Sequence, residues 1–313
     1  MTIGAATGPV RDGELEDVPC EIDNATERHD MKSTVQLLSR TLLSMLIIIV
    51  SALAALILHA ALPAKVDVSL LDGLLVNRYG FPVVATIYFL FLYTHCALIL
   101  IQNRNKVNCS DLEAEIYFGL SFTLIYMVGM QEIVIGASPC TQWGAAFVNY
   151  QLLMGIGDAI PAIILCFLVG RIFFDGKNSK HMETGIESIY AVLPFVVIVG
   201  TIRFIMSYVG VIQSDIIDYF IPVTLWGYVL GLVFGVVYLL IETATVAGLK
   251  TMVLGIGMNW MIFNSFIGLI RKDAMPDALL RSAIDIVAII FAIETLRVIM
   301  RRRLRRNLTV TSS

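Results

Sequence analysis

Hydrophobic positions along the chain are grouped in eight long runs separated by short polar segments. Each run has about 20 or more residues, enough for an α-helix to cross a hydrocarbon core of about 30 Å. The runs are evenly apolar rather than alternating, and a helix satisfies its own backbone hydrogen bonds in lipid, so we expect helices and not β-strands. The predicted spans are 38–62, 82–103, 114–136, 145–171, 189–211, 219–243, 250–270 and 278–299.

The overall composition agrees with this pattern. Hydrophobic residues make up 58% of the 313 residues and charged residues only 15%, whereas soluble domains are about half apolar and about a quarter charged. The composition therefore excludes a soluble domain, a disordered protein, a collagen-like fibre and a disulfide scaffold. We expect an all-α polytopic membrane protein with eight transmembrane helices, multi-pass in the plasma membrane.

The positions of Lys and Arg predict how the spans are oriented. With the N-terminus inside, fourteen of these residues fall on cytoplasmic segments and five in outer loops, which follows the positive-inside rule. Both termini are then cytoplasmic. The expected organisation is a disordered acidic tail at 1–36, a first four-helix membrane repeat at 37–174, a second at 186–300 and a basic tail at 301–313.

Matching motifs indicate that the two four-helix halves are related by internal duplication. Four spans per half would bring both halves into the membrane from the same side, which makes a 4+4 parallel repeat. The matched positions are 79–83 with 219–223, 129–131 with 257–259, and Asp158 with Asp285. Chance similarity between apolar segments is the alternative.

Charged residues within the spans are candidates for function, because each is costly in hydrocarbon. Asp158, Glu132 and Arg203 have no opposite charge three or four residues away on their own helix. We therefore expect an inter-helix cluster of Arg203 with Glu132, Asp158 or both. Asp285, at the matched position in the second half, is expected to face the same interior. Glu294 with Arg297, and Arg281 with Asp285, are spaced to pair along one helix.

The segment 155–161 makes Asp158 the strongest of these candidates. Glycines flank Asp158, and Pro161 removes a backbone donor and loosens the preceding turn. Interrupted helices at mid-membrane often line transport sites, and a buried unpaired carboxylate can carry a proton. A proline-kinked helix with a structural Asp–Arg bridge is the alternative.

Other features have more ordinary explanations. The stripe of Gly227, Gly231 and Gly235 predicts close helix packing, either within the bundle or in a homodimer. His59 is placed near the outer end of its span and His95 in the inner half of the next, so a bis-histidine haem is not expected. We expect no cofactor, no metal and no nucleic-acid partner.

Three classes of function remain open. The favoured hypothesis is a transporter or channel for an ion, protons included, or a small solute, with Asp158, Glu132, Arg203 and Asp285 at a site between the halves. The second is a membrane-embedded enzyme acting on a lipid or isoprenoid, for which only Asp111, Glu113 and Glu115 with Arg104 and Lys106 offer candidates. The third is a non-catalytic assembly, sensor or immunity protein. Motifs of soluble catalytic domains are absent from the sequence, so enzyme activity is not the favoured interpretation.

Overall fold

The computed structural model of the chain is helical over nearly all the residues it describes, which are 21–62, 71–135, 145–174 and 187–311. Within these ranges the extended structure consists of one isolated bridge, between Val107 and Thr245. The chain divides into two units, Met1–Leu42 and Leu43–Ser313, and helix α1 begins in the first and ends in the second. The arrangement described below concerns the second unit.

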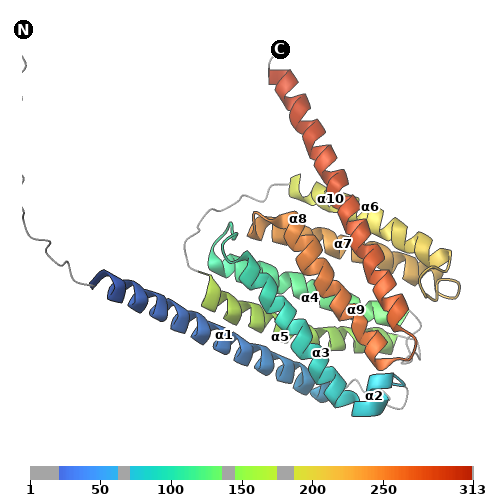
Figure 1. Cartoon of the computed structure of the whole chain (residues 1–313). Coiled ribbons are helices and arrows are strands. Elements are labelled where there is room, and N and C mark those ends of the chain that lie inside the picture. Colours follow the sequence, from blue (N-terminus) through green and yellow to red (C-terminus); the bar gives the residue numbers. More distant parts are fainter. Residues whose placement is uncertain (1–20, 63–70, 136–144, 175–186, 312–313) are drawn as a thin grey trace, which may run out of the picture. The chain divides into compact units, whose positions relative to one another are not determined.

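Figure 1 shows the order of the helices along the chain. The elements are α1 (Glu21–Ala61), α2 (Leu74–Tyr79), α3 (Phe81–Asn103), α4 (Asp111–Ile135), α5 (Ala145–Phe173), α6 (Glu187–Tyr208), α7 (Phe220–Ala244), α8 (Gly248–Lys250), the π-helical turn η2 (Thr251–Gly257), α9 (Met258–Ile270) and α10 (Met275–Thr311).

Seven segments in the described residues are long and apolar enough to cross a membrane, against the eight expected from the sequence. The segment that does not qualify is α10, whose apolar stretch contains four charged residues. These are Arg281, Asp285, Glu294 and Arg297. The polytopic membrane class is therefore supported, and the place of α10 depends on how its charges are neutralised.

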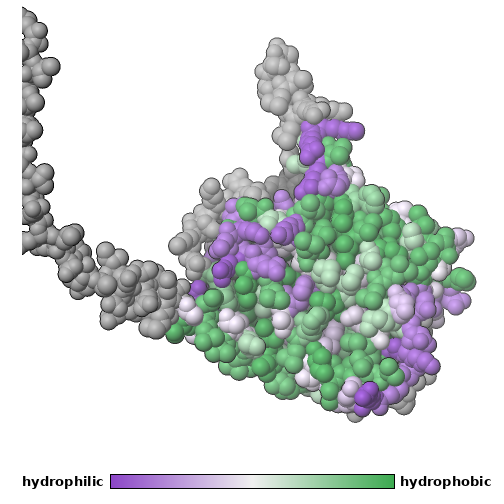
Figure 2. All heavy atoms as spheres, viewed as in Figure 1, coloured by the Kyte–Doolittle hydropathy of each residue, from purple (hydrophilic) through white to green (hydrophobic). Residues whose placement is uncertain are grey.

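Large apolar side chains remain exposed along the packed helices. Ile87 and Phe91 on α3 are each 63% exposed, although Tyr88, Leu92 and Tyr93 on the opposite face are buried. In Figure 2, apolar residues cover the helices between two hydrophilic margins on the visible face. An apolar surface of this extent is unusual for a soluble protein and is typical of a surface that contacts lipid.

Loop contacts define two ends of the bundle. At one end, called here the α2 end, the Gly73 N–H donates to the carbonyl of Ile270, and the Lys272 N–H donates to Asp72. At the other, called the Val107 end, the loop after α3 pairs with the loop after α7 through Asn108 and Val246. Loops at two opposite ends are expected when successive helices cross the same membrane layer in alternating directions.

The terminal helices are longer than the sequence boundaries suggested. Helix α1 begins at Glu21, within the segment expected as a disordered tail, and α10 continues to Thr311, within the expected basic tail. Neither 21–36 nor 301–311 contains glycine or proline, so nothing in their sequence interrupts a helix that the apolar run has nucleated.

The glycine stripe of α7 packs against α6 within the chain. A Cβ added at Gly231 would lie 2.6 Å from the carbonyl oxygen of Phe195, and one added at Gly235 would lie 2.7 Å from Val192. At Gly227 the nearest atoms would be Cβ of Arg203 and the backbone of Gly200. The stripe thus sets the close approach of the helix that carries Arg203.

Candidate functional site

The first candidate site is a hydrogen-bonded His–Asp pair between the last turn of α1 and the middle of α5. Nε2 of His59 lies 2.7 Å from Oδ1 of Asp158, whose side chain is completely buried, while the His59 side chain is 14% exposed. Nδ1 of the same ring lies 3.3 Å from Sδ of Met154. The nearest described phenols are those of Tyr88 and Tyr93 on α3, close enough to Asp158 to interact electrostatically.

Small and aromatic neighbours hold the His59 ring in place. Gly157 makes room for it, because a Cβ there would lie 2.9 Å from Cε1 of His59. Phe89 of α3 stacks on the other side, with ring centroids 5.5 Å apart. Pro161 cannot donate to the carbonyl of Gly157, so the helix carries an irregular hydrogen-bond ladder directly beside the pair.

The Asp158 carboxylate is only partly satisfied. In the part of the chain that the structure describes, its buried Oδ2 has no hydrogen-bond partner. The hydroxyl of Tyr93 donates to the backbone carbonyl of Asp158 at 3.0 Å and not to the carboxylate. A buried carboxylate oxygen without a donor favours the protonated form or a bound cation.

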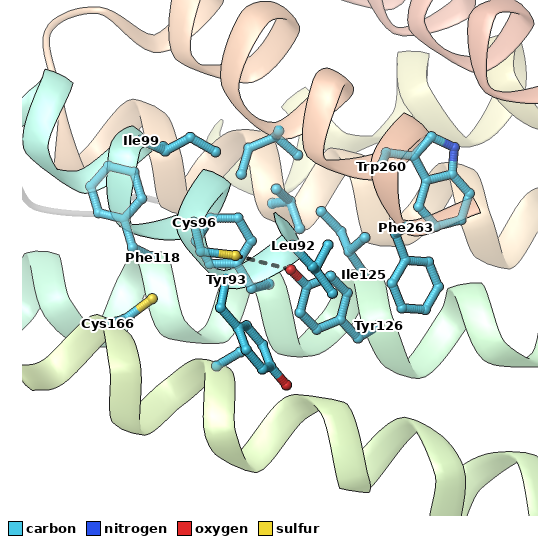
Figure 3. Close-up of a cluster of buried hydrophobic side chains, with 14 of the residues drawn as sticks. Leu92, Tyr93, Cys96, Ile99, Phe118, Ile125, Tyr126, Cys166, Trp260 and Phe263 are labelled. Carbon is cyan, nitrogen blue, oxygen red and sulfur yellow. Dashed lines mark hydrogen bonds between the residues drawn. The ribbon is translucent and has the colours of Figure 1, made fainter. Parts of the chain in front are cut away.

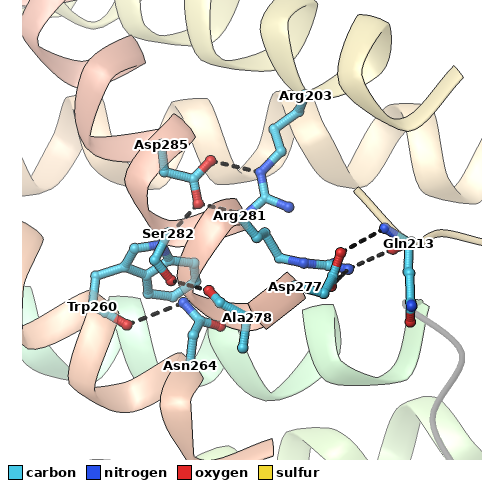
Figure 4. A network of polar contacts seen from close by, with 9 residues as sticks. All are labelled: Arg203, Gln213, Trp260, Asn264, Asp277, Ala278, Arg281, Ser282 and Asp285. Atoms are coloured by element: carbon cyan, nitrogen blue, oxygen red, sulfur yellow. Dashed lines mark hydrogen bonds and ion pairs between the residues drawn. The ribbon is translucent and has the colours of Figure 1, made fainter. Parts of the chain in front are cut away.

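The second candidate site is a fully bonded ion pair between α6 and α10 (Figure 4). Arg203 holds Asp285 with two donors, Nε to Oδ1 at 2.6 Å and a terminal nitrogen to Oδ2 at 2.5 Å. The indole N–H of Trp260 on α9 donates to the same Oδ2 at 2.8 Å. A bidentate arginine pair of this kind is strong and geometrically specific.

A neighbouring pair closes the α2 end. Arg281 on α10 lies 2.7 Å from Asp277, four residues earlier, and donates to the carbonyl of Gln213 in the loop after α6. Asp277 also accepts the backbone N–H of Gln213 at 2.8 Å. Arg281 thus pairs toward the start of its helix rather than with Asp285, which Arg203 already holds, so the expected Arg281–Asp285 pair is wrong.

The four residues expected to form one site are distributed differently. Asp158 pairs with His59 and not with Arg203, so the expected Arg203–Asp158 contact is wrong; the reason is that the last turn of α1 reaches α5 over Gly157. Arg203 pairs with Asp285, which the sequence placed only in the same interior. Glu132 lies on α4 among residues whose side chains are outside the described part.

A further buried carboxylate, on α4, was not singled out in the transport hypothesis. The Glu115 side chain is completely buried and lies 3.3 Å from Nε of Arg171 on α5. Both residues lie toward the Val107 end. Their pairing could not be predicted from the sequence, because they are on different helices and the charges at 111–115 and 171 do not indicate which residues of α4 and α5 lie side by side.

Glu113, one of the charges considered for a lipid enzyme, has a structural role. Ser110 and Glu113 form a capping box at the start of α4, in which Oε2 of Glu113 accepts the N–H of Ser110 at 3.0 Å. Burial and the nearby carboxylates of Glu113 and Asp111 raise the pKa of the Cys109 thiol to about 11. Cys109 is thus protonated near neutrality, and this region offers no activated nucleophile.

A chain of polar contacts crosses the core between α3, α4 and α9. The hydroxyl of Tyr126 donates to Oδ1 of Asn259 at 2.9 Å and lies 3.0 Å from Sγ of Cys96, the contact dashed in Figure 3. The amide of Asn259 lies 3.4 Å from Nδ1 of His95. Among the described residues, no group of three or more His, Cys, Asp or Glu side chains is placed to hold a metal ion.

The comparisons with known proteins leave the site to be interpreted from its own geometry. No protein family model, no curated protein and no solved structure shows significant similarity to the chain.

Proposed function

We propose that the chain is a proton-coupled membrane transporter for a small solute and that the His59–Asp158 pair carries the proton. The observation that carries this proposal is the completely buried Asp158, whose second oxygen has no partner among the described residues and whose cation partner is a histidine. Histidine is the side chain whose charge changes between about pH 5 and 8.

The chemistry of the pair suits reversible loading. With one proton shared between them, His59 and Asp158 form a neutral unit, either as an ion pair or as two neutral groups. Loss of that proton leaves a buried net negative charge, which favours reloading or movement of the helices. Because the two groups are hydrogen bonded, the proton belongs to the pair rather than to either residue.

An eighth span formed by α10 completes the proposed architecture. Its charges are paired: Arg203 neutralises Asp285, Asp277 neutralises Arg281, and Glu294 lies 2.6 Å from Arg297. Paired charges cost much less in the membrane than isolated ones. Eight spans place both termini on one side, and the Lys and Arg distribution makes that side the cytoplasm.

The two ion pairs also support a 4+4 repeat. His59 lies on the first predicted span and Asp158 on the fourth, while Arg203 lies on the fifth and Asp285 on the eighth. In each half, a cation on the first helix therefore meets an aspartate on the fourth. This correspondence adds a tertiary argument to the sequence motifs, one of which already matched Asp158 with Asp285.

Proton flux into proteoliposomes tests the proposal. A pH-sensitive dye inside the vesicles reports acidification under an inward pH gradient, in media that contain different small solutes. We expect wild-type protein to acidify the interior faster than empty vesicles in at least one medium. Asp158→Asn should abolish the excess rate, because the carboxamide cannot take up or release the proton.

Glu294→Gln is the matched control, since it neutralises a carboxylate on a membrane helix in a pair that is about half exposed. Its flux should match the wild type. Wild-type flux in Asp158→Asn, with the protein folded and inserted, would show that the pair is structural and would overturn the proposal.

A further inference from the structure

The bundle contains a cavity at the α2 end between α6, α7 and α10, separate from the His59–Asp158 pair. Its volume is about 20 Å³, enough for one water-sized body. The polar residues that line it are Arg203, Ser207, Ser214, Trp226 and Arg281. Gly227, the first glycine of the α7 stripe, also lines the cavity, so close packing of α7 on α6 shapes it.

Hydrogen-bond donors dominate this lining. Two guanidinium groups and an indole N–H can only donate, and the two serine hydroxyls can do so. Among the described residues the lining contains no carboxylate, although Asp285 and Asp277 pair with the two arginines (Figure 4). The described polar lining of the cavity therefore consists of hydrogen-bond donors.

Two of these donors are buried and unsatisfied. In the described part of the chain, Nε1 of Trp226 and Oγ of Ser214 have no hydrogen-bond partner. Native proteins seldom leave buried donors unpaired, and such groups mark the place of a water, ion or ligand. A ligand that accepts several hydrogen bonds and carries negative charge would satisfy both donors and face both guanidinium groups.

We propose that this cavity binds a small anion, either a free inorganic anion or the carboxylate group of an organic solute. The inference deepens the proposed function, on which it rests, because it names the chemical class of the transported solute. One proton taken up by the His59–Asp158 pair and one anion bound beside Arg203 and Arg281 leave the net charge of the protein unchanged. Carrying both together avoids moving net charge through the hydrocarbon.

Thermal unfolding of the full chain in detergent tests anion binding without requiring transport. The sodium salt of a bulky organic sulfonate, which carries no carboxylate and is too large for the cavity, is replaced stepwise by chloride or formate at constant ionic strength and pH. An anion at about five times its Kd should raise Tm by roughly 2–4 °C. A rise with chloride identifies a free inorganic anion, and a rise confined to formate identifies a carboxylate group.

Trp226→Phe is the decisive variant, because it keeps an aromatic ring and removes only a donor that has no partner within the described structure. It should fold like the wild type and weaken anion binding about tenfold or more, as expected for loss of a hydrogen bond to a charge. Ser214→Ala removes the second unsatisfied donor and should also weaken binding. Lys272→Gln, which removes a positive charge from the same end at an exposed position, should leave binding unchanged.

The outcomes separate this inference from the proposed function. Asp158→Asn should retain the anion-dependent rise in Tm, and Trp226→Phe should retain proton exchange at Asp158. Absence of any anion-specific rise, or an equal rise in Trp226→Phe, would overturn the anion site and leave the proton proposal standing. Anion binding without proton exchange would overturn the proposed function alone.

Discussion

Asp158 and Asp285 are both completely buried aspartates on membrane helices, and each faces a basic side chain from another helix. Their surroundings differ. Asp285 receives two donors from Arg203 and a third from Trp260, whereas Asp158 has one bond to His59, and its Oδ2 has no partner among the described residues. The first arrangement holds a charge permanently, and the second leaves room for a proton.

The difference between the two pairs follows from the basic residue that each aspartate contacts. A guanidinium group stays charged at any physiological pH and binds a carboxylate through a rigid fork. An imidazole loses its charge near neutrality. The proposed function therefore assigns a structural role to the pair between α6 and α10 and proton exchange to the pair between α1 and α5. The predictions below test this contrast, from the largest expected effect to the smallest.

Breaking the permanent pair should have the largest effect on stability. Asp285→Asn leaves the buried Arg203 without its carboxylate, and loss of one partner of a buried pair costs about 3–5 kcal/mol. The free energy of unfolding in mixed detergent micelles measures this loss. Asp158→Asn should cost only about 1 kcal/mol, because it removes one hydrogen bond from a carboxylate that is already partly unsatisfied. Equal losses of unfolding free energy in the two variants would contradict the proposed difference between the two pairs.

Converting the first pair into a copy of the second should abolish transport without unfolding the protein. In His59→Arg the cation stays charged, so we expect proton flux to fall at least tenfold while the unfolding temperature stays near that of the wild type. His59→Gln serves as the comparison, since it also blocks exchange but leaves the Asp158 charge without a cation. Flux that persists in His59→Arg would mean that His59 does not take part in proton exchange.

Filling the space beside the imidazole should have an intermediate effect. Gly157→Ala places a Cβ 2.9 Å from Cε1 of His59, so the ring must shift from its position against Asp158. Overpacking of this kind costs about 1–3 kcal/mol, and proton flux should fall several-fold. Glu294→Gln is the control, because we expect it to change the free energy of unfolding by less than about 0.5 kcal/mol and to leave the proton flux unchanged. Unchanged proton flux in Gly157→Ala would mean that proton flux does not depend on the position of the His59 ring.

The helices and their buried carboxylates could be predicted from the sequence because hydrophobic run length and intramembrane charge are local properties. The pattern of apolar runs and charges in the sequence placed Asp158, Arg203 and Asp285 in the interior. The spacing of Glu294 and Arg297 predicted their pair, which the structure confirms. Arg203 was expected to meet Glu132, Asp158 or both, because none of the three has an opposite charge three or four residues away on its own helix, and a contact between helices was the simplest solution.

Partner choice could not be predicted, because it depends on the register between helices. His59 was judged by its depth near the end of its span, yet it meets Asp158, since the Cβ-free surface at Gly157 lets the ring reach α5. Glu115 and Arg171 illustrate the same limit, because neither has an obvious partner until α4 and α5 are packed. The cavity beside Trp226 and Ser214 likewise arises only when three helices meet.

The central claim is that the His59–Asp158 pair exchanges a proton and the Arg203–Asp285 pair does not. Infrared difference spectra of the purified protein between about pH 5 and 8 test it directly, because a carboxylic acid and a carboxylate absorb at different frequencies. The account predicts that Asp158→Asn removes part of the difference spectrum, in the carboxylic acid or carboxylate bands or in the imidazole bands, and that Asp285→Asn leaves the spectrum unchanged. A difference spectrum that Asp158→Asn leaves unchanged, or a loss that occurs only in Asp285→Asn, would contradict it.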